Sequence, residues 1–67
     1  MAINGTRQIK NLMGRVVVLP LGGESVRGKL KDVRGGWIIL EECHTRSGPV
    51  DGELWAALPI PWIQAVP

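Results

Sequence analysis

Apolar and polar residues alternate in the middle of the chain, as they do in half-buried β-strands. Within residues 25–34 the alternation places one set of residues inward (Val26, Gly28 and Leu30) and a basic set outward (Arg27, Lys29 and Lys31). Apolar runs at residues 15–21 and 37–46 flank this segment. Two Gly-Gly pairs separate the three segments, and glycine readily takes the positive φ that tight hairpin turns need. The pattern therefore predicts a three-stranded meander.

A glycine stands inside the middle strand of this meander. Gly28 weakens a strand unless the backbone has to bend sharply at that point. In a chain of only 67 residues, a bent middle strand predicts a small and highly curved barrel.

The N-terminal part of the chain predicts a short helix. Ile9, Leu12 and Met13 recur at helical spacing and form one apolar stripe, so we expect a helix over residues 4–13. Gly14 suits the end of that helix.

The remaining residues predict two further strands, with proline marking the interruptions. Residues 54–58 and 62–66 are expected to be the fourth and fifth strands, and residues 47–53 a polar loop. The Pro-Ile-Pro segment 59–61 is expected to be a tight connector, because proline cannot donate to a β-ladder. For the same reason Pro20 predicts that the first strand ends early or bulges.

Composition indicates a domain with more apolar material than one small barrel needs. The chain is 45% hydrophobic and has three tryptophans and a single cysteine. One cysteine excludes an intramolecular disulfide, and no pattern of ligands suggests a metal or another cofactor. Small domains without such staples often oligomerise, and surplus apolar surface usually marks an interface. Self-association is therefore expected.

The sequence gives no sign of export or of membrane insertion. The N-terminus lacks an apolar segment of signal-peptide length, and no run approaches about 18 apolar residues. A cytoplasmic location is the expectation.

Charge is distributed unevenly along the chain. Residues 1–34 contain seven of the eight Lys and Arg residues, whereas residues 35–67 contain four of the six acidic residues. Such asymmetry is typical of a surface that faces a polyanion. The alternative is a solvated surface of mixed charge.

The segment from residue 14 to residue 40 resembles the first sequence motif of the Sm and Sm-like family, which includes bacterial Hfq. In that motif a valine-rich strand leads to a turn glycine, a second glycine follows five residues later, and apolar positions continue the pattern. Those positions are occupied here by Gly23, Gly28, Leu30, Val33 and residues 38–40.

The resemblance implies a mainly β fold over residues 1–67, a single domain with a short N-terminal helix and a five-stranded, strongly bent antiparallel open barrel. It also implies a closed homo-oligomeric ring of about five to seven subunits, in which the last strand of one subunit pairs with the fourth strand of the next. The alternative is that the C-terminal strand pairs within its own barrel. The residues expected at the subunit contact are Trp55, Leu58, Ile60, Trp62, Ile63 and Val66.

Sm-like proteins typically hold bases of single-stranded RNA in a pocket that this chain does not reproduce. Arg34 occupies the position of the family's aspartate, Gly36 occupies the stacking position, and Pro59-Ile60 replaces a late basic pair. A different RNA site is expected on the basic face, where cations contact phosphates and a tryptophan stacks on a base. Its candidate residues are Arg27, Lys29, Lys31, Asp32, Arg34 and Trp37. For Trp37, a position in the core or at an interface is the alternative.

Catalysis has little support. Cys43 and His44 are adjacent, so on a strand they point to opposite faces and cannot act as a nucleophile and base. An oligonucleotide-binding barrel of another family is disfavoured because the chain has no Phe and no Tyr. Two functions remain: a ring that binds single-stranded RNA, or an assembly module whose partner is protein.

Overall fold

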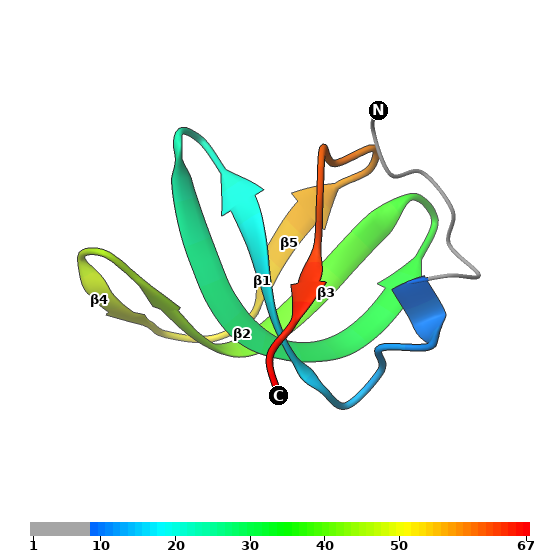
Figure 1. Cartoon of the computed structure of the whole chain (residues 1–67), viewed down its shortest axis with the longest axis horizontal. Helices are drawn as coiled ribbons and strands as arrows, with labels where there is room; N and C mark the ends of the chain where they lie inside the picture. The colour runs from blue at the N-terminus through cyan, green and yellow to red at the C-terminus, as the bar shows by residue number, and fades with distance from the viewer. Residues whose placement is uncertain (1–8) are drawn as a thin grey trace.

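A strongly curved antiparallel sheet, which does not close on itself, holds most of the residues that the computed structural model describes, residues 9–67 (Figure 1). Its strands are β1 (Val16–Leu21), β2 (Glu24–Arg34), β3 (Trp37–Thr45), β4 (Gly48–Val50), β5 (Leu54–Ala57) and β6 (Gln64–Ala65). The predicted mainly β, antiparallel and open architecture is thereby confirmed.

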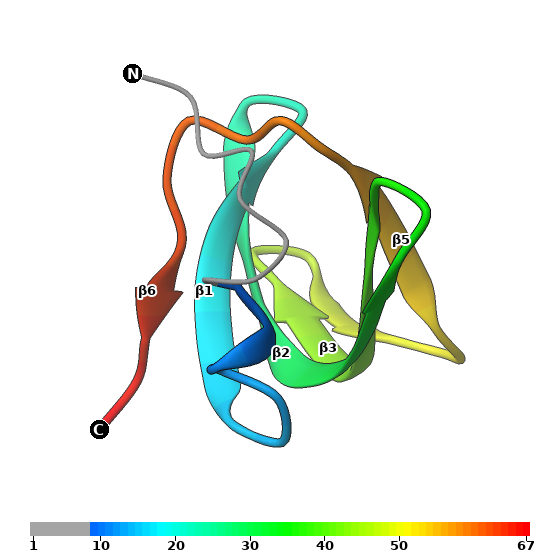
Figure 2. The same cartoon turned by 90° about the vertical axis from the view of Figure 1, so that its right-hand side faces the viewer.

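The two ends of the sheet are formed by the C-terminal strands. The central order is β6-β1-β2-β3, and the far side of β3 is shared by β5 along Trp37–Leu40 and by β4 along Cys43–Thr45. β6 pairs with Val17 and Val18 of β1, so the C-terminal strand does pair within its own chain. Figure 2 shows β6 and β5 on opposite sides of the molecule. Within the described residues, β5 pairs only with β3 and β6 only with β1, so each has a free edge.

Both Gly-Gly pairs form the predicted hairpin turns. Gly22 and Gly23 have φ of 58° and 87°, and Leu21 lies opposite Glu24 across the turn. Pro20 does not end β1, contrary to expectation, because it lies opposite Ser25 in the register. Pairs next to a two-residue turn are hydrogen-bonded and the next pairs are not, so Pro20 withholds no ladder bond from β2.

β2 is strongly curved (Figure 1), and Gly28, where the sequence predicts the bend, lies in the middle of this strand opposite a register shift in β3. A Cβ atom at Gly28 would lie 2.7 Å from Cys43 Sγ and 3.2 Å from the carbonyl oxygen of Glu41. Only glycine therefore lets β2 and β3 approach this closely. The flanking inward residues Val26 and Leu30 are completely buried, whereas the basic residues between them face outward.

The core fills the concave side of the curved sheet and comes from every long strand. Its members are Ile9, Val17, Leu19, Val26, Leu30, Val33, Ile38, Leu40, Cys43, Ala56 and Ile60. Ile9 is 1% exposed and Leu12 packs partly against the core, whereas Met13 is 42% exposed. Residues 4–8 of the helix predicted over residues 4–13 lie outside the described residues, and residues 11–13 form a turn rather than a helix.

Two irregularities in the β2–β3 register were not predicted. Arg27 pairs with His44 and Lys29 with Glu41, so β3 contains one extra residue opposite Gly28. The bulge is centred on Glu42, whose φ of 53° lies in the left-handed region. A second shift occurs between Leu30 and Asp32. Bulges of this kind bend a strand and re-aim its side chains.

β4 is also absent from the prediction, which placed a loop over residues 47–53. Gly48 and Pro49 are poor strand formers, so the sequence carries no strand signal there. Pro49 is tolerated because β4, among the residues that the structure describes, is an edge strand that pairs only with the end of β3. Residues 9–67 thus form six strands where five were expected for the chain.

Candidate nucleic-acid interface

Half of the predicted basic face is neutralised by acidic partners. Lys31 forms an ion pair with Glu53, a residue 22 positions away that precedes β5. This contact raises the pKa of Lys31 and lowers that of Glu53. Arg34 donates from Nε (3.1 Å) and Nη2 (2.9 Å) to Oδ2 of Asp32, and the pKa of Asp32 is lowered by Arg34 and then by the Val33 amide.

The other two cations of this face have no acidic partner within ion-pair distance among residues 9–67. Arg27 and Lys29 are both exposed and flank the bend at Gly28. Unpaired surface cations are the ones that can neutralise a bound phosphate. The structure therefore concentrates the available positive charge of β2 at its bend.

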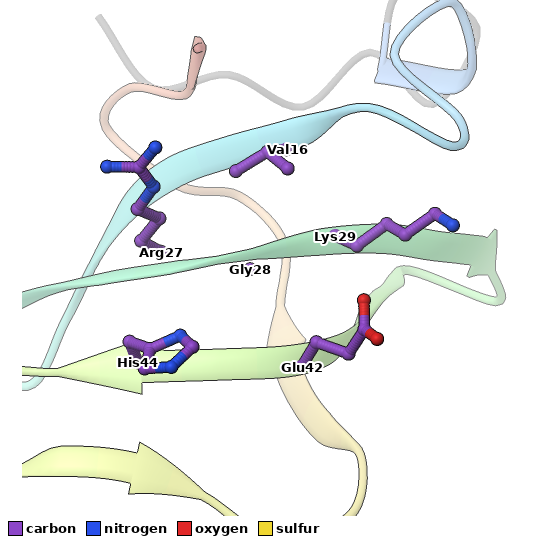
Figure 3. Close-up of a pocket in the computed structure, with 6 residues that line it drawn as sticks. All are labelled: Val16, Arg27, Gly28, Lys29, Glu42 and His44. Atoms are coloured by element: carbon purple, nitrogen blue, oxygen red, sulfur yellow. The ribbon is translucent and has the colours of Figure 1, made fainter.

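A shallow hollow of about 460 Å³ lies beside Gly28, on the face of the sheet where Arg27 and Lys29 are exposed (Figure 3). We call it the Gly28 hollow. It is lined by Val16 from β1, Arg27, Gly28 and Lys29 from β2, and Glu42 and His44 from β3. Arg27 and His44 lie toward one end of the hollow, and Lys29 and Glu42 toward the other.

The bulge in β3 is what brings Glu42 to this hollow. In a regular strand Glu42 would point to the face opposite Glu41. With the extra residue, Glu42 is exposed and lines the hollow, while the next residue, Cys43, still points into the core. Glu42 was not among the predicted site residues, because a left-handed glutamate has no sequence signature. His44 and Val16 were also not predicted, because the strand register that brings them to the hollow is not visible in the sequence.

The left-handed backbone at Glu42 is unfavourable for a residue with a Cβ atom. The conformation costs about 1–2 kcal/mol for an L-residue that is not glycine, asparagine or aspartate. Such outliers often occur where a side chain has a task that offsets the cost. The backbone conformation of Glu42 therefore indicates a functional role for this lining residue, and this indication does not rely on the shape of the hollow.

A second feature of the outer surface is a pair of tryptophans from neighbouring strands. Trp37 and Trp55 have ring centroids 6.2 Å apart with their planes at 58°, and they are 43% and 48% exposed. Ile39, which lies opposite Trp55 in the β3–β5 register and two residues from Trp37, is 3% exposed although it does not belong to the core cluster. Trp55 Nε1 donates to Oε1 of Glu53 at 3.3 Å. The structure thus joins Trp37, a candidate for base stacking, with Trp55, a candidate for the subunit contact.

The other candidates for the subunit contact differ in accessibility. Trp62 is 40% exposed, whereas Leu58 and Ile63 are partly buried against the core and Val66 is half-buried. Ile60 is 4% exposed and belongs to the core of its own chain. The side chain of Ile60 thus packs within its own chain, whereas the prediction placed it at the contact with a neighbouring subunit.

Cys43 and His44 lie on opposite faces of β3, as predicted. Cys43 is 1% exposed, and burial raises the pKa of its thiol, whereas His44 faces solvent. Within residues 9–67 no three His, Cys, Asp or Glu side chains gather closely enough to hold a metal ion. In that same part of the chain, none of the helices is long and apolar enough to cross a bilayer.

Comparisons with protein-family models, with curated proteins and with solved structures found no match to the chain.

Proposed function

We propose that this chain is an Sm-like protein that assembles into a ring and binds single-stranded RNA on the outer face of β2 and β3. The observation that carries the RNA proposal is the Gly28 hollow, where Arg27 and Lys29, two cations without an ion-pair partner among residues 9–67, lie on either side of Gly28. Phosphate neutralisation supplies most of the affinity in such binding, and a ring repeats the same weak site in every subunit.

The ring proposal is supported by the two free edges of the sheet. β5 and β6 lie at opposite ends, and each pairs on one side only among the described residues. Pairing of β5 of one subunit with β6 of the next is a head-to-tail contact, which closes into a ring when the rotation per subunit allows it. It also covers apolar edges that otherwise invite aggregation.

The hydrogen-bond pattern of β5 provides a sharp test of this contact. Leu58 N donates to Gly36 O at 2.8 Å. Because hydrogen-bonded and non-bonded pairs alternate along an antiparallel ladder, the amide of Ala56 faces β3 and the amide of Ala57 faces the free edge. Ala57→Pro therefore removes a donor from the free edge and none from the β3–β5 ladder.

The ring is tested by native mass spectrometry of Ala57→Pro beside Ala57→Ser, which keeps the amide. We expect the wild type and Ala57→Ser to form one discrete oligomer and Ala57→Pro to be a folded monomer. An intact oligomer of Ala57→Pro, or a monomeric wild type, contradicts the edge-pairing proposal.

RNA binding is tested by fluorescence anisotropy with labelled single-stranded RNA. The matched double variants are Arg27→Gln with Lys29→Gln and Lys31→Gln with Arg34→Gln, which remove the same charge. We expect the first pair to lose at least about tenfold in affinity and the second to lose about twofold or less, because Lys31 and Arg34 are already paired with acids. Absence of binding by the wild type refutes the RNA proposal, and equal losses refute the role of the hollow.

The second candidate function is an assembly or protein-interaction module without RNA binding. The specific observation that favours it is the Trp37–Trp55 pair, a half-exposed aromatic surface over buried Ile39. Tryptophan is enriched where proteins contact one another. Under this function Trp37→Ser with Trp55→Ser abolishes the interaction with the protein partner, whereas Arg27→Gln with Lys29→Gln leaves it unchanged.

A further inference from the structure

The Gly28 hollow holds a carboxylate that phosphate binding alone does not explain. Glu42 would repel a bound phosphate, yet the bulge in β3 aims its side chain at the same hollow as Arg27 and Lys29. A site that bound only phosphates would have a higher affinity without the Glu42 carboxylate. The carboxylate therefore suggests a ligand that brings hydrogen-bond donors as well as negative charge.

From this arrangement we propose that the Gly28 hollow is a guanine-selective subsite for single-stranded RNA, with Glu42 as the residue that recognises the base. This inference rests on the proposed RNA binding and adds to it the identity of the preferred base.

The chemistry of the base edges singles out guanine. Its Watson–Crick edge presents two adjacent donors, N1–H and N2–H, and the two oxygens of a carboxylate accept both. Uracil offers a single N3–H between two carbonyl oxygens. Cytosine and adenine each place an acceptor nitrogen beside their amino group, and that nitrogen repels the carboxylate. In single-stranded RNA these edges are free to be recognised in this way.

The charge of the hollow also fits one nucleotide. Arg27 and Lys29 with Glu42 give the lining a net charge of +1 when His44 is neutral. A nucleotide within RNA carries one negative charge. Since Lys29 and Glu42 lie toward the same end and no ion pair joins them, each remains available, the ammonium for a phosphate and the carboxylate for a base.

The shape of the hollow gives the base and the sugar something to rest on. Its floor is the backbone at Gly28, and Val16, 38% exposed, supplies an apolar wall from β1. His44 lies at the end where Arg27 does and presents an imidazole ring on which a base or ribose can pack.

The backbone of Glu42 adopts a conformation that supports a functional role for its side chain. Its φ of 53° is unfavourable for glutamate and natural for glycine. A glutamate at such a position indicates that the side chain itself is needed there. Glu41, its neighbour on β3, has no such conformation and does not line the hollow, so it provides a control of identical charge.

The experiment compares short oligouridines that carry a single guanosine, adenosine, cytidine or uridine at the centre, measured by fluorescence anisotropy against the full chain. We expect the guanosine oligonucleotide to bind about tenfold more tightly than the other three, the discrimination that a good bidentate base contact provides. Glu42→Gln abolishes that preference without weakening binding to plain oligouridine. Glu41→Gln removes the same charge and keeps the preference.

The outcomes separate this inference from the function on which it rests. If wild type binds none of the oligonucleotides, both fail. If wild type binds all four equally, RNA binding stands and guanine selectivity is refuted. If the preference persists in Glu42→Gln, the base is recognised elsewhere and the assignment to Glu42 is overturned. Should Glu42→Gln fail to fold, the wild-type series alone still decides whether guanine is preferred.

Discussion

Substituting alanine for Gly28 perturbs the position on which both the curvature of the sheet and the floor of the hollow depend. The new Cβ would lie 2.7 Å from Cys43 Sγ, 3.2 Å from the carbonyl oxygen of Glu41 and 3.4 Å from the Cα of Cys43. Two of these three atoms belong to the backbone of β3 and cannot rotate away. The third belongs to a side chain that is 1% exposed and packs in the core.

The change in the free energy of unfolding for Gly28→Ala follows from two opposing effects. Overpacking a well-packed core costs about 1–3 kcal/mol, and the backbone contacts place Gly28→Ala in the upper half of that range. Replacing glycine also restricts the unfolded chain, which returns about 0.4–1 kcal/mol. We therefore expect a net loss of about 2 kcal/mol in the free energy of unfolding. Against a total of about 3–10 kcal/mol for a domain of 67 residues, this is a large fraction.

The assay is urea denaturation followed by tryptophan fluorescence, at several protein concentrations because association also contributes to stability. Cys43→Ala removes the Sγ atom and provides the second arm of a double-mutant cycle. We expect Gly28→Ala to cost about 1 kcal/mol less in that background than in the wild type. A change of under about 0.5 kcal/mol for Gly28→Ala refutes the steric explanation, and an equal cost in both backgrounds refutes the contribution of the Cys43 Sγ contact.

Three further predictions concern residues around the same bend. Glu42→Gly should raise the free energy of unfolding by about 0.5–1 kcal/mol by relieving the left-handed backbone, and a lower urea midpoint would show that the conformation is not unfavourable. The thiol of Cys43 should react with a thiol reagent such as DTNB only at the rate of unfolding, because it is buried and its pKa is raised; rapid labelling of the folded protein would contradict its burial. The carboxylates of Asp32 and Glu53 have pKa values lowered below 3.8 and 4.5, so their stabilising contribution is complete above about pH 5 and is lost as pH falls through the lowered values. The urea midpoint of wild type should therefore fall more on acidification than that of Asp32→Asn, and parallel pH profiles would refute the Asp32 contribution.

Local signals in the sequence predicted the framework of the sheet correctly. The Gly-Gly pairs fix the hairpins because positive φ is a property of the residues themselves, and alternation fixes which side of β2 faces the core. Gly28 was informative because a glycine inside a strand needs a steric reason, and that reason proved to be the close approach of Glu41 and Cys43 of β3.

Features that depend on contacts between distant residues could not be predicted. The ion pair of Lys31 with Glu53 joins residues 22 positions apart, so the sequence does not show that Lys31 has an acidic partner. The bulge at Glu42 arises from the register between β2 and β3, and no residue type in the sequence predicts it. The Trp37–Trp55 pair likewise follows from the pairing of β3 with β5.

The central proposal is that Arg27 and Lys29, the cations of β2 without an ion-pair partner among residues 9–67, bind the phosphates of single-stranded RNA. The most direct test is the slope of the logarithm of the binding constant against the logarithm of the salt concentration, which is about −0.7 for each phosphate neutralised on a single strand. We predict a steep slope for wild type and for Lys31→Gln with Arg34→Gln, and a clearly shallower slope for Arg27→Gln with Lys29→Gln. A wild type that does not bind at low salt, or a slope that the Arg27 and Lys29 substitutions leave unchanged, would contradict the claim.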